Sequence, residues 1–88
     1  MPDRVHKMLL TAISAARHGI APESALVEAI IAGDRSLAIE QLRFDSLAWM
    51  EFCISVELQS GQELTPADIA DMSYVSEIEE WLRVRLAR

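Results

Sequence analysis

The residues with the clearest chemical potential lie in one short segment, Asp45-Ser46-Leu47. Asp45 and Ser46 are both good N-cap residues, and Gly61 is a good helix stop, so we expect a long helix over residues 45–60. A serine hydroxyl at a helix start is exposed and lies in the positive field of the helix N-terminus. For an isolated Asp-Ser pair, the simpler interpretation of Ser46 is an N-cap.

The helix predicted over residues 45–60 carries two apolar stripes. One stripe consists of Trp49, Phe52, Cys53 and Val56, and the other of Leu47, Met50, Ile54 and Leu58. A helix that packs on one core needs a single stripe, so the second is either covered by another part of the chain or left for a partner. Glu51 and Glu57 flank the second stripe, which would suit transient docking. The spacing leaves both interpretations open.

Negative charge is concentrated in the second half of the chain. The formal net charge is -6, and no lysine or arginine lies between Arg43 and Arg83. Nine acidic residues lie in that interval: Asp45, Glu51, Glu57, Glu63, Asp68, Asp71, Glu77, Glu79 and Glu80. This charge argues against nucleic acid as a partner and favours basic protein surfaces, although a solvated acidic face that serves solubility is the alternative.

No set of side chains suggests catalysis or metal binding. Cys53 is the only cysteine and falls on the inward stripe, where a free cysteine usually acts as a small apolar residue. His6 and His18 do not form a metal-ligand pattern. We therefore expect no catalytic residues, no metal and no enzymatic activity. A small hydrolase or thiol enzyme would need activity that depends on Cys53 or a histidine.

The elements that would position Ser46 are all helical. In residues 4–18 apolar side chains recur at i, i+3, i+4, i+7, i+8 and i+11, which predicts a helix capped by Asp3 and ended by Gly19. A short helix starting near Pro22 or Ser24 would run through Ala32. Residues 36–44 read as a packed loop with at most one further turn of helix. A short helix over 65–72 would begin at Thr65-Pro66, and the last helix, over 74–86, would be capped by Ser73.

Length and composition predict one small domain over residues 1–88. Hydrophobic residues make up 51% of the chain, which favours folding over disorder. No apolar run approaches the roughly 18 residues that a membrane span needs, and the first residues lack the pattern of a signal peptide. We therefore expect a cytoplasmic protein, without a membrane span, that works as a monomer.

A longer pattern surrounds Ser46. Residues 40–47 read Glu-Gln-Leu-Arg-Phe-Asp-Ser-Leu, and Leu58 and Leu64 flank the end of the helix that follows. Thr65-Pro66-Ala67-Asp68-Ile69 then begins the short helix, and Met72-Ser73-Tyr74-Val75 introduces the last one. In order and spacing, residues 40–82 resemble the modification region of acyl and peptidyl carrier proteins. The first helix resembles them only in general character.

The resemblance implies an all-α fold: a small four-helix bundle of the acyl-carrier-protein type, with a long loop between its first and second helices. It implies that Ser46, between Asp45 and Leu47, carries a covalent 4′-phosphopantetheine arm added by a phosphopantetheinyl transferase. Further partners would be a loading enzyme and downstream synthases or transferases in lipid, polyketide or nonribosomal peptide synthesis. Leu47, Met50, Glu51, Ile54 and Glu57 fall where the family presents its recognition surface, which favours the partner interpretation of the second stripe.

The chain departs from the family beside Ser46. Arg43 stands where many members have glycine, and Ala48-Trp49 follows Ser46-Leu47 where many fatty-acid carriers have a polar residue. Trp49 lies on the inward stripe, where it would either line or fill a cavity for an acyl chain, or simply pack in the core. The rival to the carrier interpretation is a helical adaptor that binds partners through the acidic, two-striped helix and bears no cofactor.

Overall fold

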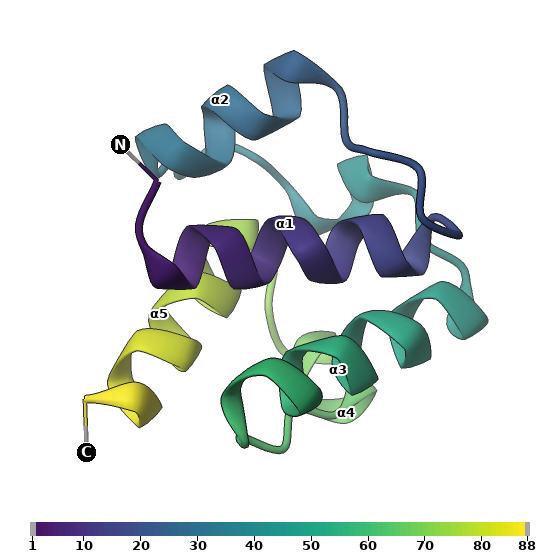
Figure 1. Ribbon diagram of the computed structural model, residues 1–88, viewed down its shortest axis with the longest axis vertical. Helices are drawn as coiled ribbons and strands as arrows, with labels where there is room; N and C mark the ends of the chain where they lie inside the picture. Colours follow the sequence, from purple (N-terminus) through teal and green to yellow (C-terminus); the bar gives the residue numbers. More distant parts are fainter. Residues whose placement is uncertain (1, 88) are drawn as a thin grey trace.

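A computed structural model describes residues 2–87 of the chain (Figure 1). The described residues form five α-helices and one short 3-10 helix: α1 (Arg4–Ala16), α2 (Ser24–Ala32), η1 (Ile39–Leu42), α3 (Ser46–Ser60), α4 (Pro66–Ala70) and α5 (Val75–Leu86). Extended pairing within residues 2–87 is limited to a single bridge between Ala38 and Tyr74. The predicted all-helical class is confirmed.

Helix α1 is the central element. It packs against α3, α5 and α2, and α2 and α3 lie on opposite sides of it (Figure 1). The predicted apolar face is confirmed, because all six of its members are buried: Val5, Met8, Leu9, Ala12, Ile13 and Ala16. The spacing of these residues places them on one side of the helix, so their burial withdraws a continuous stripe from water.

The inner stripe of α3 forms the other half of this core. Phe52, Cys53 and Val56 are buried, whereas Trp49 at the start of the helix is only half-buried. Two residues of α5, Ile78 and Leu82, are fully buried against the same cluster. The middle of the domain is therefore filled by side chains from α1, α3 and α5.

Both predicted ends of α3 are confirmed. Asp45 is the N-cap, and its carboxylate accepts a hydrogen bond from the Ala48 N–H at 2.8 Å. At the other end Gly61 adopts a left-handed conformation with φ 74°, and its N–H donates to the Glu57 carbonyl. Glycine takes this conformation without a steric cost, so it stops the helix where the sequence pattern placed the stop.

The connection between α1 and α3 is more ordered than a long loop. It contains α2, which buries Leu26 and Ile30, and η1, which buries Leu42. Residues 2–87 thus carry five α-helices, and the bundle expected from the resemblance has four. The apolar side chains of this segment account for the difference, since they cover parts of the core that would otherwise face water.

Three predicted helix boundaries are wrong. Helix α1 ends at Ala16 and not at His18, because His18 and Gly19 are already left-handed with φ of 59° and 85°. Helix α4 ends at Ala70 rather than at residue 72. Ser73 does not cap α5: the helix begins at Val75, after Tyr74 in the N-cap position.

A carboxylate takes the role that we predicted for the Ser73 hydroxyl. The side chain of Glu77 reaches back and accepts hydrogen bonds from the backbone N–H groups of Ser73 at 2.6 Å and Tyr74 at 2.8 Å. These two bonds satisfy donors that a helix start otherwise leaves without partners. They also lower the pKa of the Glu77 carboxyl below its ordinary value of 4.5.

A polar cluster joins the start of α1 to α5. Arg83 bonds to Asp3 at 2.8 Å and to Glu79 at 3.1 Å, and Nε2 of the buried His6 lies 3.3 Å from Glu79. Glu79 and Arg83 lie one turn apart on α5, and the packing of α5 on α1 brings them to Asp3 and His6.

The hydrogen bonds of Glu77 make folding sensitive to acid. Because they lower the folded pKa, their stabilisation is present above the unfolded pKa of 4.5 and is lost as the pH falls through the lower folded value. We expect Glu77→Gln to reduce the free energy of unfolding near neutral pH. The difference between variant and wild type should be smaller at about pH 3. Urea denaturation at both pH values measures it. Glu80→Gln, at an exposed position on the same helix, is the control, and an equal Glu77→Gln deficit at both pH values would contradict the expectation.

Candidate functional site

Ser46 is the first residue of α3 and is exposed. Asp45 supplies the cap, and the Ser46 hydroxyl makes no hydrogen bond with any residue in the range 2–87. The N–H groups of Ser46 and Leu47 have no partners within the helix, as at any helix start. Ser46 therefore presents a free hydroxyl beside free backbone donors, and it is not the residue that holds the helix end.

The turn before Ser46 depends on an arginine in an unusual conformation. Arg43, which follows η1, is left-handed with φ 56°. This conformation costs a residue with a side chain about 1–2 kcal/mol, whereas glycine adopts it freely. Buried Leu42 on one side and the Asp45 cap on the other hold the turn in place. The backbone at this position thus has the shape that favours glycine, and the chain places a cation there.

Three aromatic rings pack together next to the turn that precedes Ser46. Trp49 meets the Phe44 ring at 4.8 Å and the Phe52 ring at 5.4 Å, both in edge-to-face geometry. Such pairs contribute about 0.5–1.5 kcal/mol each beyond the area that they bury. Trp49 is half-buried, so it forms part of a wall at the surface instead of filling an interior cavity.

Ser46 lies on the rim of an apolar groove with a volume of about 480 Å³. We call it the Ser46 groove, and α3, α4, η1 and the segment after α4 line it: Ser46, Trp49, Met50, Pro66, Ile69, Ala70, Ile39 and Met72. Its volume falls within the range of about 300–1,000 Å³ that is usual for small-molecule sites. The serine is the one residue of this lining that carries a hydroxyl group.

A second hollow, of about 440 Å³, adjoins the first. It shares the walls formed by Ile39, Trp49 and Met72 and adds the residues Glu40, Arg43, Phe44 and Ser73. We call it the Arg43 hollow. Within residues 2–87 the side chains of Glu40 and Arg43 form no ion pair with each other or with another group.

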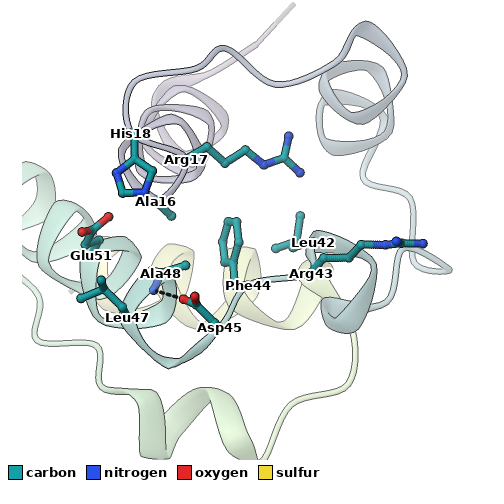
Figure 2. Close-up of a pocket in the computed structure, with 10 residues that line it drawn as sticks. All are labelled: Ala16, Arg17, His18, Leu42, Arg43, Phe44, Asp45, Leu47, Ala48 and Glu51. Atoms are coloured by element: carbon teal, nitrogen blue, oxygen red, sulfur yellow. Dashed lines mark hydrogen bonds between the residues drawn. The ribbon is translucent and has the colours of Figure 1, made fainter.

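A third hollow, of about 210 Å³, lies on the other side of the α3 start (Figure 2). Figure 2 shows the Phe44 ring standing between the end of α1 and the start of α3, and the Arg43 side chain extending away from Asp45. Arg17 lines this hollow but is already paired with Glu23 at 2.8 Å. Ser46 is not part of its wall, so we do not include this hollow in the candidate site.

The second stripe of α3 faces outward. Its four members expose large fractions of their area: Leu47 58%, Met50 53%, Ile54 55% and Leu58 82%. Beside it Glu57 is exposed and Glu51 is half-buried. Residues 2–87 do not cover this stripe, which removes one of the two interpretations that spacing left open.

The acidic residues divide into two groups. Four of the nine make hydrogen bonds or ion pairs inside the fold: Asp45, Asp68, Glu77 and Glu79. The other five make none with the described residues: Glu51, Glu57, Glu63, Asp71 and Glu80. The second group is the part of the negative charge that is left for a partner or for solvent.

The cysteine and the histidines take no part in this site. Cys53 is buried, and its burial together with the nearby Asp68 charge raises the pKa of the thiol to about 11. His6 belongs to the cluster at the start of α1, and His18 lies exposed beyond its end. From residue 2 to residue 87, no group of three or more His, Cys, Asp or Glu side chains could hold a metal ion.

Two further findings concern the whole described chain. None of its helices combines the length and the apolar character required to cross a membrane. Comparisons with protein-family models, with curated proteins and with solved structures find no match for this chain. The interpretation of the site therefore rests on its own residues.

Substitutions can test whether Asp45, and not Ser46, stabilises the start of α3. We expect Asp45→Ala to lower the free energy of unfolding by about 1 kcal/mol, because the Ala48 N–H loses its acceptor. Ser46→Ala removes a hydroxyl without a partner and should change stability by no more than about 0.5 kcal/mol. Urea denaturation of both variants tests this. A loss in Ser46→Ala as large as that in Asp45→Ala would mean that the serine has a structural role.

Proposed function

We propose that this chain is a carrier protein whose Ser46 bears a 4′-phosphopantetheine arm. The observation that carries the proposal is the position of the Ser46 hydroxyl: exposed, without a partner in the fold, and on the rim of an apolar groove. In this proposal α1, α3, α4 and α5 correspond to the four helices of the carrier bundle. Helix α2 and η1 belong to the long connection between the first two of them.

The residues fit the proposed group. The free N–H groups of Ser46 and Leu47 suit the phosphodiester, and the positive end of the α3 dipole favours its charge. Beside the serine, the Ser46 groove offers apolar surface to an organic chain. The arm would supply a terminal thiol that holds an acyl or aminoacyl group as a thioester. The chain needs no base of its own for attachment, because the transferase can supply one.

The exposed stripe supports a role in docking. Leu47, Met50 and Ile54 form an apolar strip beside Ser46, and Glu51 and Glu57 add negative charge along it. An apolar strip with an acidic border suits brief contact with partners whose own rim is basic. The proposed partners are a phosphopantetheinyl transferase, a loading enzyme, and downstream synthases or transferases of lipid, polyketide or nonribosomal peptide synthesis.

Intact mass tests the attachment. The purified protein is incubated with coenzyme A, magnesium and a broad-specificity phosphopantetheinyl transferase. We expect a gain of one phosphopantetheine, absent in Ser46→Ala. Ser24→Ala is a matched control, since Ser24 is likewise an exposed serine at the first position of a helix.

Two results would overturn the carrier proposal. The first is a folded protein that gains no mass, including with the transferase of its own source organism. The second is a gain that persists in Ser46→Ala and is lost in Ser24→Ala. Because Ser46→Ala should leave the fold nearly intact, a lost gain in that variant reports the attachment site and not unfolding.

The exposed stripe also favours a second candidate, an adaptor without a cofactor. Such a protein would bind through Met50, Ile54 and Glu57, and its function would survive Ser46→Ala. The stripe alone fits this candidate as well as it fits a carrier. The free hydroxyl beside an apolar groove is the feature that the adaptor leaves unexplained.

A charge placed in the stripe tests its role in docking. We expect Ile54→Glu to slow modification of Ser46 by the transferase, because it puts a carboxylate into the apolar strip. Initial rates of mass gain measure the effect. Val84→Glu is the control, because Val84 is 44% exposed on α5, outside the stripe. Equal rates for the two variants would show that the transferase does not use the stripe.

A further inference from the structure

Arg43 is an exposed cation at a backbone position that favours glycine. Its left-handed conformation, with φ 56°, carries a steric cost for any residue that has a Cβ. Within residues 2–87 its guanidinium forms no ion pair, and Glu40, which lines the same hollow, does not pair with it. No ion pair in the fold therefore uses this charge. Backbone strain that persists without such a return is characteristic of residues that take part in function.

The turn that carries Arg43 lies directly before the candidate site. Arg43 and Phe44 line the hollows on both sides of this turn. Figure 2 shows the Arg43 side chain extending away from Asp45, so the guanidinium does not approach the carboxylate that caps α3. A partner that reaches Ser46 from outside meets a free positive charge three residues before the serine.

The other cations of residues 2–87 do not duplicate this charge. Arg17 lines a hollow beside the start of α3, but it is paired with Glu23 at 2.8 Å. Arg4 and Lys7 line a different hollow, which includes the last turn of α3. Of the described arginines and lysines that line a hollow beside the start of α3, Arg43 is the one without an ion pair.

The second stripe of α3 carries the opposite charge. Glu51 and Glu57 border it, and neither forms an ion pair with a described residue. The surface around Ser46 is thus negative along α3 and positive in the turn before it. A wholly acidic surface accepts any partner with a basic rim. One positive charge at its end adds discrimination, because a cation opposite Arg43 is repelled and a carboxylate there fixes the register of docking.

We propose that Arg43 determines partner specificity. It pairs with a carboxylate that the transferase of the protein's own source organism presents opposite the turn, and it disfavours enzymes that present a cation there. Glu51 and Glu57 face the basic rim of the same transferase. This inference rests on the proposed function, because the transferase requires Ser46 as its substrate. Arg43 touches no reacting atom, so it acts in recognition and not in the transfer step.

Initial rates of mass gain with that transferase test the inference. We expect Arg43→Lys to keep most of the wild-type kcat/KM, because it keeps the charge. Arg43→Gln should lower kcat/KM about two- to fivefold, the scale of an exposed ion pair, and Arg43→Glu should lower it further. The change should lie in KM, because the residue acts in association. It should also diminish as the salt concentration rises, because salt screens exposed charges.

Two controls separate the charge of Arg43 from other effects. Arg35→Glu makes the same change in net charge at an exposed arginine that lines none of the hollows beside Ser46, and should leave the rate unchanged. Arg43→Gly relieves the left-handed backbone and removes the charge, so it should be as slow as Arg43→Gln. Lysine, glutamine and glutamate meet the same backbone cost as arginine, and circular dichroism checks that every variant folds.

The outcomes distinguish the two proposals. A wild-type protein that gains no mass would overturn the carrier function, and this inference with it. Mass gain at wild-type rates in Arg43→Gln or Arg43→Gly, or an Arg43→Glu rate no lower than that of Arg35→Glu, would overturn the role of Arg43 alone. A rate that is kept in Arg43→Lys, reduced in Arg43→Gln and Arg43→Glu, and less affected at high salt would establish that role.

Discussion

The packing of α1 against α3 is the interaction on which the rest of the structure depends. Ile13 of α1 and Phe52 and Val56 of α3 are at most 1% exposed, which removes the most apolar face of each helix from water. Because α3 turns that face to α1, only another element could cover its opposite face. Helix α4 has only five residues and covers part of it, so the stripe from Leu47 to Leu58 is left exposed. The exposure of the second stripe is thus a consequence of which face α1 takes.

The turn over residues 42–45 depends on the same packing. Leu42 is buried, Arg43 turns left-handed, Phe44 contacts Trp49, and the Asp45 carboxylate closes the helix start. Because Asp45 satisfies the helix end, the next residue has no structural duty and its hydroxyl is free. The backbone cost at Arg43 is acceptable in a loop held from both sides.

Local rules predicted the elements whose signals are strong and close in sequence. The periodic face of α1, the Asp45 cap and the Gly61 stop of α3, and the Thr65-Pro66 start of α4 all appear as expected. The wrongly predicted helix boundaries lie where two residues that could each set the boundary are close in sequence. His18 entered a left-handed turn ahead of Gly19, and Glu77 displaced Ser73 because a carboxylate one turn into the helix reaches two N–H groups. The contacts of His6 with Glu79 and of Asp3 with Arg83 had no local signal, since they form only where α5 packs on the start of α1.

The sequence by itself determined the helical class, the position of Ser46 at a helix start and the presence of two apolar stripes on one helix. Each of these follows from residues within a few turns of one another, where spacing alone decides which side chains share a face. Only the tertiary structure decided which stripe is buried, that Trp49 lines a groove rather than fills a cavity, and that Ser46 lies on the rim of that groove. These outcomes depend on how η1, α3 and α4 approach each other, and the free energy that selects that arrangement comes from the whole core and not from any single segment.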